Sequence, residues 1–415
     1  MTTESRTREE LAPARLLGPD LLRGVGIILL LLTNVPLILT PIRYEQVVGA
    51  SPFTGVPVDD AAIMLFLSVP TMTGMGMFVL AMGHGLARAG AGRREFRYAI
   101  IRLGAIGVVG LLHGLLVWWG DILLYYFIAG VIALYFRFRQ PIAQIAIGAS
   151  ITMFPLVLVV SDLLARIGTR GDGATNAMSA VSDAYRGLQA DAASAYGSHD
   201  AGAILQQRLT DWLVYMQDFA PVGLPQLVGL LLIGIGISRL RAAGSTVLKT
   251  GRARSVLVIA VVVAGAAYLY QLGVQILLPH DTGVLSALST WCQVIAPPVL
   301  AVAMYVLILM RETRLSASPL VRAVAAMGRY PLSIYIFTSI ICAVAAYGFG
   351  YYGRVSASGA VAIGVVLTIV FALLSIAMDR AGKQGPMESL IRLVVKRRRP
   401  DQAQATSRGE GTWNR

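Results

Sequence analysis

The stretch Arg102–Phe136, RLGAIGVVGLLHGLLVWWGDILLYYFIAGVIALYF, decides the fold because it is apolar along its length yet contains one histidine and one aspartate. It predicts two membrane-spanning helices, 98–119 and 121–136, joined by a turn at Gly120. A titratable side chain inside a bilayer is costly and normally faces the protein interior, so His113 and Asp121 are the first candidates for a functional site. The turn brings them closer than the distance of about 12 Å that eight residues of one straight helix would impose.

Composition places the whole chain in the same class. It has 415 residues, of which 56% are hydrophobic and 14% charged, with a mean hydropathy of +0.68. These values predict an all-α, polytopic integral membrane bundle surrounded by membrane lipids. The formal charge of +13 comes from basic residues in short segments between apolar runs. Positive-inside orientation accounts for that pattern, so we do not expect nucleic-acid binding.

Apolar runs and basic loops together predict about ten spans in the cell membrane, with both termini cytoplasmic. Residues 1–20 form a cytoplasmic segment, 21–395 one membrane domain, and 396–415 a basic, disordered tail. Within the domain, 168–217 is predicted to be an external amphipathic segment that acts as a lid. Oligomeric state is not indicated. The expected spans are 21–40, 61–87, 98–119, 121–136, 141–165, 219–238, 255–278, 290–310, 330–346 and 357–378.

Three ordered motifs carry a family resemblance: PDLLRGVGIILLLLTN, RLGAIGVVGLLHGLLVWWGDILLYY and MGRYPLSIYIFTSIICAVAAYGFG. They resemble the YeiB-like family of bacterial membrane proteins, also called domain of unknown function 418. That family is similar to the wider transmembrane acyltransferase superfamily, which implies a cytoplasmic acyl-coenzyme A as co-substrate. Asp20, Leu22, Arg23 and Gly24 look like the opening LDxxRG of those enzymes. The histidine that many of them carry near the end of the first helix is replaced around Asn34, which directs the catalytic assignment to His113.

The enzyme interpretation is transfer of an acyl group to a hydroxyl or amine of a small-molecule or glycan acceptor. His113 would act as general base and Asp121 would orient it. A converging set of arginines would bind the coenzyme diphosphate. No metal is expected, because the sequence has no metal-type spacing. The coenzyme candidates are Arg23, Arg102 and Arg329, and the substrate candidates are Asn34, Trp118 and Tyr125.

Each candidate also has a structural alternative. His113 could hydrogen-bond between helices, Asp121 could cap the helix that follows it, and the arginines could snorkel to the membrane surface. Trp118 and Trp119 fit an interfacial aromatic belt better than a stacking site for substrate. The alternative function is a transporter or exporter of a small molecule or lipid-linked metabolite, in which His113 and Asp121 would bind protons or substrate.

Overall fold

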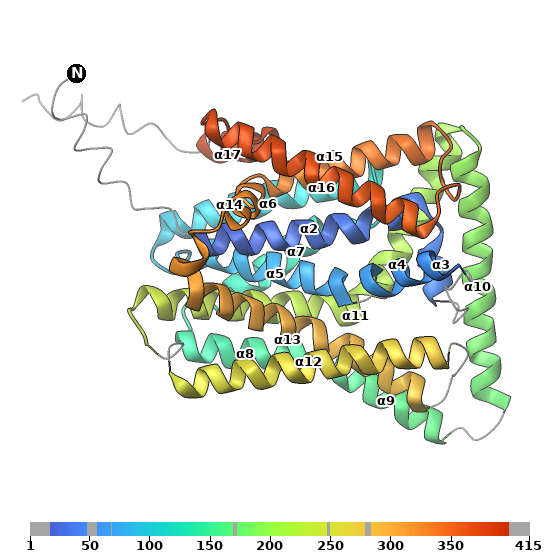
Figure 1. Ribbon diagram of the computed structural model, residues 1–415, viewed down its shortest axis with the longest axis horizontal. Helices are drawn as coiled ribbons and strands as arrows, with labels where there is room; N and C mark the ends of the chain where they lie inside the picture. Colours follow the sequence, from blue (N-terminus) through green and yellow to red (C-terminus); the bar gives the residue numbers. More distant parts are fainter. Residues whose placement is uncertain are drawn as a thin grey trace, which may run out of the picture.

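The computed structural model describes residues 17–47, 56–67, 69–168, 172–246, 250–278 and 284–397. All regular structure in these ranges is helical, which confirms the all-α bundle (Figure 1). The helices are α2 (Leu17–Leu39), α3 (Ile42–Val47), α4 (Pro57–Leu67), α5 (Val69–Leu86), α6 (Arg93–Leu116), α7 (Leu123–Tyr135), α8 (Pro141–Met153), α9 (Leu156–Gly168), α10 (Asp172–Gly197), α11 (Ala201–Ala242), α12 (Gly251–Leu277), α13 (Val284–Leu315), α14 (Pro319–Met327), α15 (Pro331–Ala343) with a π-helical turn (Val344–Gly348), α16 (Ala357–Arg380) and α17 (Pro386–Arg397).

Eight helices in the described ranges are long and apolar enough to cross a membrane. Two shorter apolar helices, Met72–Leu86 and Leu123–Tyr135, run alongside them. Together they are consistent with the expected ten or so spans. Many of their large apolar side chains are exposed, as expected for helices whose outer surface meets lipid rather than water.

One predicted span is interrupted. The segment predicted as one helix over 141–165 is divided into α8 and α9 at Phe154 and Pro155. Proline lacks a backbone N–H and its ring disfavours the helical conformation of the residue before it, so it ends one helix and begins another. The span predicted over 61–87 corresponds to α4 and α5, and residue 68 between them lies outside the described ranges.

The largest departure from the predicted topology is α11. The sequence predicted a separate external segment, 168–217, followed by a span over 219–238. Instead α11 is one continuous helix of 42 residues that includes both the end of this segment and the predicted span. Within the predicted external segment, only α10 is a separate helix. The start of α11 is fixed by Asp200, whose side chain accepts a hydrogen bond from the Gly202 N–H (2.8 Å). The prediction of two separate elements was therefore wrong.

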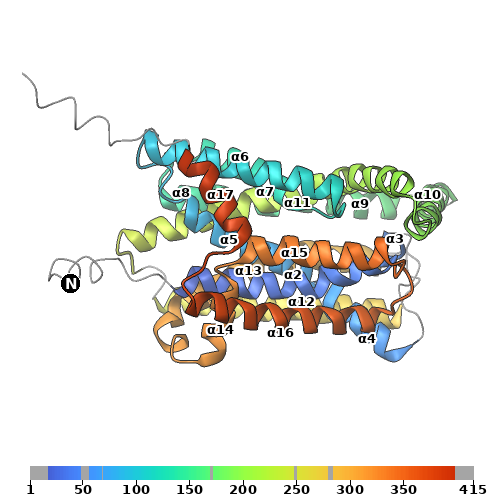
Figure 2. The ribbon, with the colours of Figure 1, turned by 90° about the horizontal axis from the view of Figure 1, so that it is seen from above.

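The bundle has two distinct ends. α10 runs across one of them, which we call the α10 end (Figure 1). At the opposite end, which we call the basic end, α2 begins, α16 finishes, and α14 and α17 are packed (Figures 1 and 2). α17 crosses there from α16 toward α6, and it contacts both α6 and α15. Leu17, the first described residue, is already helical, so α2 includes residues 17–20 of the predicted N-terminal segment, whereas 1–16 and 398–415 lie outside the described residues.

Candidate functional site

A close crossing of α2 and α14 builds the basic end. A Cβ added at Gly24 would lie 1.9 Å from the Val324 carbonyl oxygen, and one at Gly328 would lie 1.7 Å from the Asp20 carbonyl oxygen. Only glycine permits such an approach of two backbones. The glycines of the first and last family-like motifs thus bring Asp20 and Arg329 into one place.

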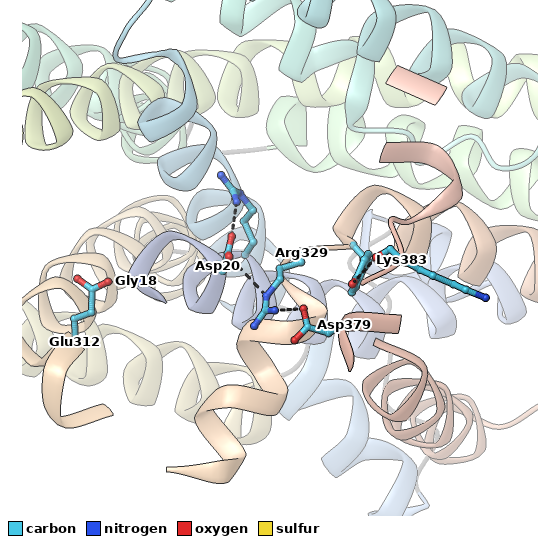
Figure 3. Close-up of polar contacts among 8 residues, drawn as sticks. Gly18, Asp20, Glu312, Arg329, Asp379 and Lys383 are labelled. Carbon is cyan, nitrogen blue, oxygen red and sulfur yellow. Dashed lines mark hydrogen bonds and ion pairs between the residues drawn. The ribbon is translucent and has the colours of Figure 1, made fainter. Parts of the chain in front are cut away.

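Arg23 and Arg329 share Asp20. The Arg23 guanidinium donates to Asp20 Oδ1 (2.9 Å), and Arg329 Nε lies 3.9 Å from Asp20 Oδ2. Arg329 is also paired with Asp379 at the end of α16 (Figure 3). Both arginines therefore take part in an ion network inside the bundle rather than extending freely toward the membrane surface.

A cavity of about 500 Å³ opens beside this network. It is lined by the three arginines predicted to converge, Arg23, Arg102 and Arg329, so the structure brings that set together. Lys383 and Arg392 add two further cations, while Asp379 and Glu388 supply carboxylates. Arg102 has no carboxylate partner in the part of the chain that the structure describes. The lining is cationic overall, as a site for an anionic ligand requires.

α17 forms one wall of the cavity and is fastened to the start of α15. Glu388 accepts hydrogen bonds from the N–H groups of Leu332 (2.9 Å) and Ser333 (3.2 Å). The Ser333 hydroxyl donates to the same carboxylate and accepts from the Met387 N–H (3.1 Å). Each side chain thereby satisfies free N–H groups at the start of the other helix.

The predicted dyad is formed. His113 Nδ1 lies 3.0 Å from Asp121 Oδ1, and both side chains are almost completely buried. Asp121 Oδ2 accepts from the Leu124 N–H (3.0 Å), so this carboxylate also caps α7 as the structural alternative proposed. When the Asp121 carboxylate is ionised it can only accept a hydrogen bond; a neutral His113 then donates from Nδ1 and has Nε2 as an acceptor. Nε2 is buried and has no hydrogen-bond partner among the described residues.

The cavity extends from the basic end toward the dyad. Its lining includes Leu123 and Tyr126 on the first turn of α7, directly after Asp121. His113 itself is not in the lining. Arg102 and His113 lie on the same helix, about 16 Å apart along its axis. One cavity therefore runs from the arginines to the residues that lie against the dyad.

Unlike the three arginines, the three substrate candidates do not line the cavity. Asn34 is buried within α2, and Tyr125 donates its hydroxyl to the Met216 carbonyl (2.6 Å), which commits it to α11. Trp118 lies with its ring 6.5 Å from that of His113. Trp118 and Trp119 are only 2% and 5% exposed, so the interpretation as an interfacial belt was wrong. They pack under α10 and α11 instead of facing lipid.

Sequence reasoning missed a buried network at the α10 end. Asp211 is fully buried and accepts from the hydroxyls of Tyr44 (2.5 Å) and Tyr196 (2.6 Å) and from Gln207 Nε2 (3.3 Å). Burial is the main cause that raises the pKa of both tyrosines far above the ordinary value, and the Asp211 carboxylate raises it further. Both therefore remain neutral donors. The signal was Asp211 within QQRLTDW, which was assigned to an external segment.

Two buried arginines accompany this network. Arg43 stacks 4.0 Å from the centre of the Trp119 ring and lies 3.6 Å from Asp218. Arg208 donates to the Leu116 carbonyl (2.5 Å) at the end of α6. Within the described ranges, no group of three or more histidine, cysteine or acidic side chains that could hold a metal ion occurs.

Comparison with known proteins places the chain among relatives of undetermined function. Residues 239–398 match the family model described as "Protein of unknown function (DUF418)". The uncharacterized protein YxaH of Bacillus subtilis (strain 168) is 24% identical over 402 residues, covering 90% of this chain and 92% of YxaH. The uncharacterized protein YeiB of Escherichia coli (strain K12) is 24% identical over 411 residues, covering 94% of this chain and 98% of YeiB. No solved structure matches. The YeiB-like resemblance is confirmed; the relation to acyltransferases stays a prediction.

Proposed function

We propose that this YeiB-like membrane protein, which carries the DUF418 match, transfers an acyl group from acyl-coenzyme A to a hydroxyl or amine acceptor. One observation carries the proposal: the lining of a single cavity of about 500 Å³ includes three arginines and also Leu123 and Tyr126, which follow Asp121 of the His113–Asp121 pair in the chain. Coenzyme A has matching polarity, with anionic phosphates at one end and the thioester at the end of a long, uncharged arm. Arginine is well suited to phosphate oxygens.

In this mechanism His113 Nε2 accepts the proton of the acceptor hydroxyl or amine. The acceptor atom attacks the thioester carbonyl carbon, the new C–O or C–N bond forms, and the C–S bond breaks. The proton held on Nε2 then passes to the departing thiolate. Asp121 accepts the hydrogen bond from His113 Nδ1–H throughout. This hydrogen bond fixes the tautomer and stabilises the positive charge that His113 acquires.

A buried histidine–aspartate pair between membrane-spanning helices also favours a second candidate, proton-coupled transport of a small molecule. The two functions differ in what they require. Transfer consumes acyl-coenzyme A in detergent solution, whereas transport needs a sealed membrane and consumes no thioester. The measurement is therefore thioester consumption by the purified full chain, wild type against His113→Gln. Consumption that depends on His113 supports transfer, and equal rates for the two proteins would refute it.

We also propose that the basic end faces the cytoplasm, so that the cavity opens where acyl-coenzyme A is made. Positively charged loops favour that side. Single cysteines placed at Arg94 and Asp191 can test the orientation with a membrane-impermeant thiol reagent on intact cells. The cysteine at 191 should react and the one at 94 should not. The reverse pattern would overturn the orientation.

A further inference from the structure

Several buried polar atoms around the end of α6 have no hydrogen-bond partner in the described part of the chain. An unsatisfied buried donor costs about 1 to 3 kcal/mol, so a concentration of them calls for an explanation such as a missing ligand. Three of these atoms can only donate hydrogen bonds, because they belong to a guanidinium and two indoles. They are Arg208 Nε, Trp118 Nε1 and Trp212 Nε1.

Arg208 and Trp212 face the same surface. They lie four residues apart on α11, which puts them on one side of the helix. Arg208 donates to the Leu116 carbonyl, and Trp212 Nε1 lies 2.6 Å from where a Cβ on Gly114 would be. Both therefore contact the last turn of α6, the turn that also carries His113.

The charge of Arg208 is not balanced by a carboxylate. Arg208 is 7% exposed, stacks 5.1 Å from the centre of the Tyr347 ring, and forms no ion pair among the described residues. Nearby Asp211 accepts from neutral tyrosine hydroxyls and a glutamine amide instead. The C-terminus of α6, to which the Leu116 carbonyl belongs, contributes as a whole only about half a negative charge. An isolated buried cation of this kind is destabilising unless something neutralises it.

We propose that the α10 end binds an oxyanion, the carboxylate or phosphate group of a small solute, between Arg208 and Trp212. Donor-only nitrogens require acceptor oxygens, and the uncompensated guanidinium requires negative charge. The site lies at the far side of the dyad from the cavity. Identifying the solute as the acceptor of the acyl group rests on the proposed function, whereas oxyanion binding itself does not.

Tryptophan fluorescence can report this site selectively. Three of the five tryptophans, Trp118, Trp119 and Trp212, lie at the α10 end, and none of the described residues that line the cavity at the basic end is a tryptophan. The purified full chain would be titrated at constant ionic strength with acetate, inorganic phosphate, and the matched pair glycerol and glycerol 1-phosphate. We expect a saturable change with at least one anion and none with glycerol. Acetate against phosphate then distinguishes the two anion classes.

Variants decide whether the response comes from the proposed site. Arg208→Gln should weaken anion binding about 10- to 100-fold, as expected for loss of a charge-assisted hydrogen bond. Trp212→Phe keeps the ring but removes the N–H, and it should weaken binding by about tenfold even if Arg208→Gln fails to fold. Arg186→Gln, at an exposed arginine of α10, should leave the affinity unchanged.

Two results would overturn the inference: no saturable response of the wild type to any of the anions, or equal affinity in wild type and Trp212→Phe. In either case Arg208 would serve only to cap α6. The titration contains no acyl donor. Its failure therefore leaves the proposed transfer reaction standing, and a chain that binds anions but consumes no thioester would refute the reaction alone.

Discussion

At the basic end, Arg23 and Arg329 meet Asp20 and Asp379 beside an open cavity, whereas at the α10 end Arg208 is packed against the Tyr347 ring with no carboxylate partner in the described ranges. The first site is built from ion pairs that remain partly exposed. The second is closed, aromatic and short of acceptors. His113 and Asp121 lie between the two.

The difference indicates two kinds of ligand access. Partly exposed ion pairs exchange with solvent at small cost, so an incoming anion can compete for Arg23 and Arg329. A buried cation with unsatisfied donors is stabilised most by an anionic ligand that loses its own water and stays bound. We therefore expect the basic end to bind a ligand that arrives and leaves each cycle, and the α10 end to be selective for charge.

The largest effect should follow removal of the group between the two ends. His113→Gln should lower turnover about 100- to 10,000-fold, the usual contribution of a general base, with coenzyme A binding retained. Thioester consumption and melting temperature would be measured on the same preparation. His84→Gln is the control, because His84 bonds to Ser238 (2.9 Å) outside the cavity lining. If His113→Gln turns over normally while folded, His113 is not the base.

The next largest effect separates the two ends directly. Arg329→Gln should weaken coenzyme A binding about 10- to 100-fold by removing a cation from the cavity, while saturating donor restores most of the turnover. Isothermal titration with coenzyme A gives the affinity. Arg186→Gln is the surface control. Unchanged affinity in Arg329→Gln would remove the basic end from donor binding.

A smaller effect should come from the fastening of α17. Glu388→Gln removes the charge that accepts from Leu332, Ser333 and the Ser333 hydroxyl, so it should cost about 1 to 2 kcal/mol of stability. We also expect faster hydrogen exchange in α17, since this wall of the cavity would open more often. Glu95→Gln, on α6, should change neither. Protection of α17 identical to wild type would show that other contacts hold the wall.

The last comparison sets a paired hydroxyl against an unpaired one at the α10 end, and the unpaired one should give the smallest effect of all. Tyr44→Phe leaves Asp211 without one of its donors and should cost about 1 to 3 kcal/mol. Tyr347→Phe removes a hydroxyl with no partner among the described residues, and it should change stability by less than about 0.5 kcal/mol. Unfolding free energies of the two variants test this. Equal losses would mean that the Tyr347 hydroxyl has a partner that the structure does not describe.

Sequence patterns were sufficient for the dyad and the arginines because each depends on short-range rules. A turn at Gly120 returns the chain beside itself, and inner helix ends lie at one side of a membrane. The helical class followed from composition. The motifs containing Gly24 and Gly328 pointed to the place where α2 and α14 cross, although the crossing itself depends on packing that no periodicity reveals.

The α10 end could not be predicted for physical reasons. Asp211 and Arg208 lie in a segment polar enough to be assigned to the membrane surface, and their burial depends on a cover formed by α10 and the π-helical turn after α15. Trp118 and Trp119 were assigned to an interfacial belt because tryptophan is enriched at membrane surfaces. Their burial also depends on α10, which is distant in sequence. Burial by a distant element leaves no local pattern, because the covering residues are far away in sequence.

The most direct test of the central claim is a cryo-electron microscopy map of the full chain with coenzyme A bound. The account predicts density for the diphosphate among Arg23, Arg102 and Arg329, with the pantetheine arm directed along the cavity toward Leu123 and its thiol closest to His113. Coenzyme density at the α10 end, or a lipid chain occupying the cavity in the presence of saturating coenzyme A, would contradict it.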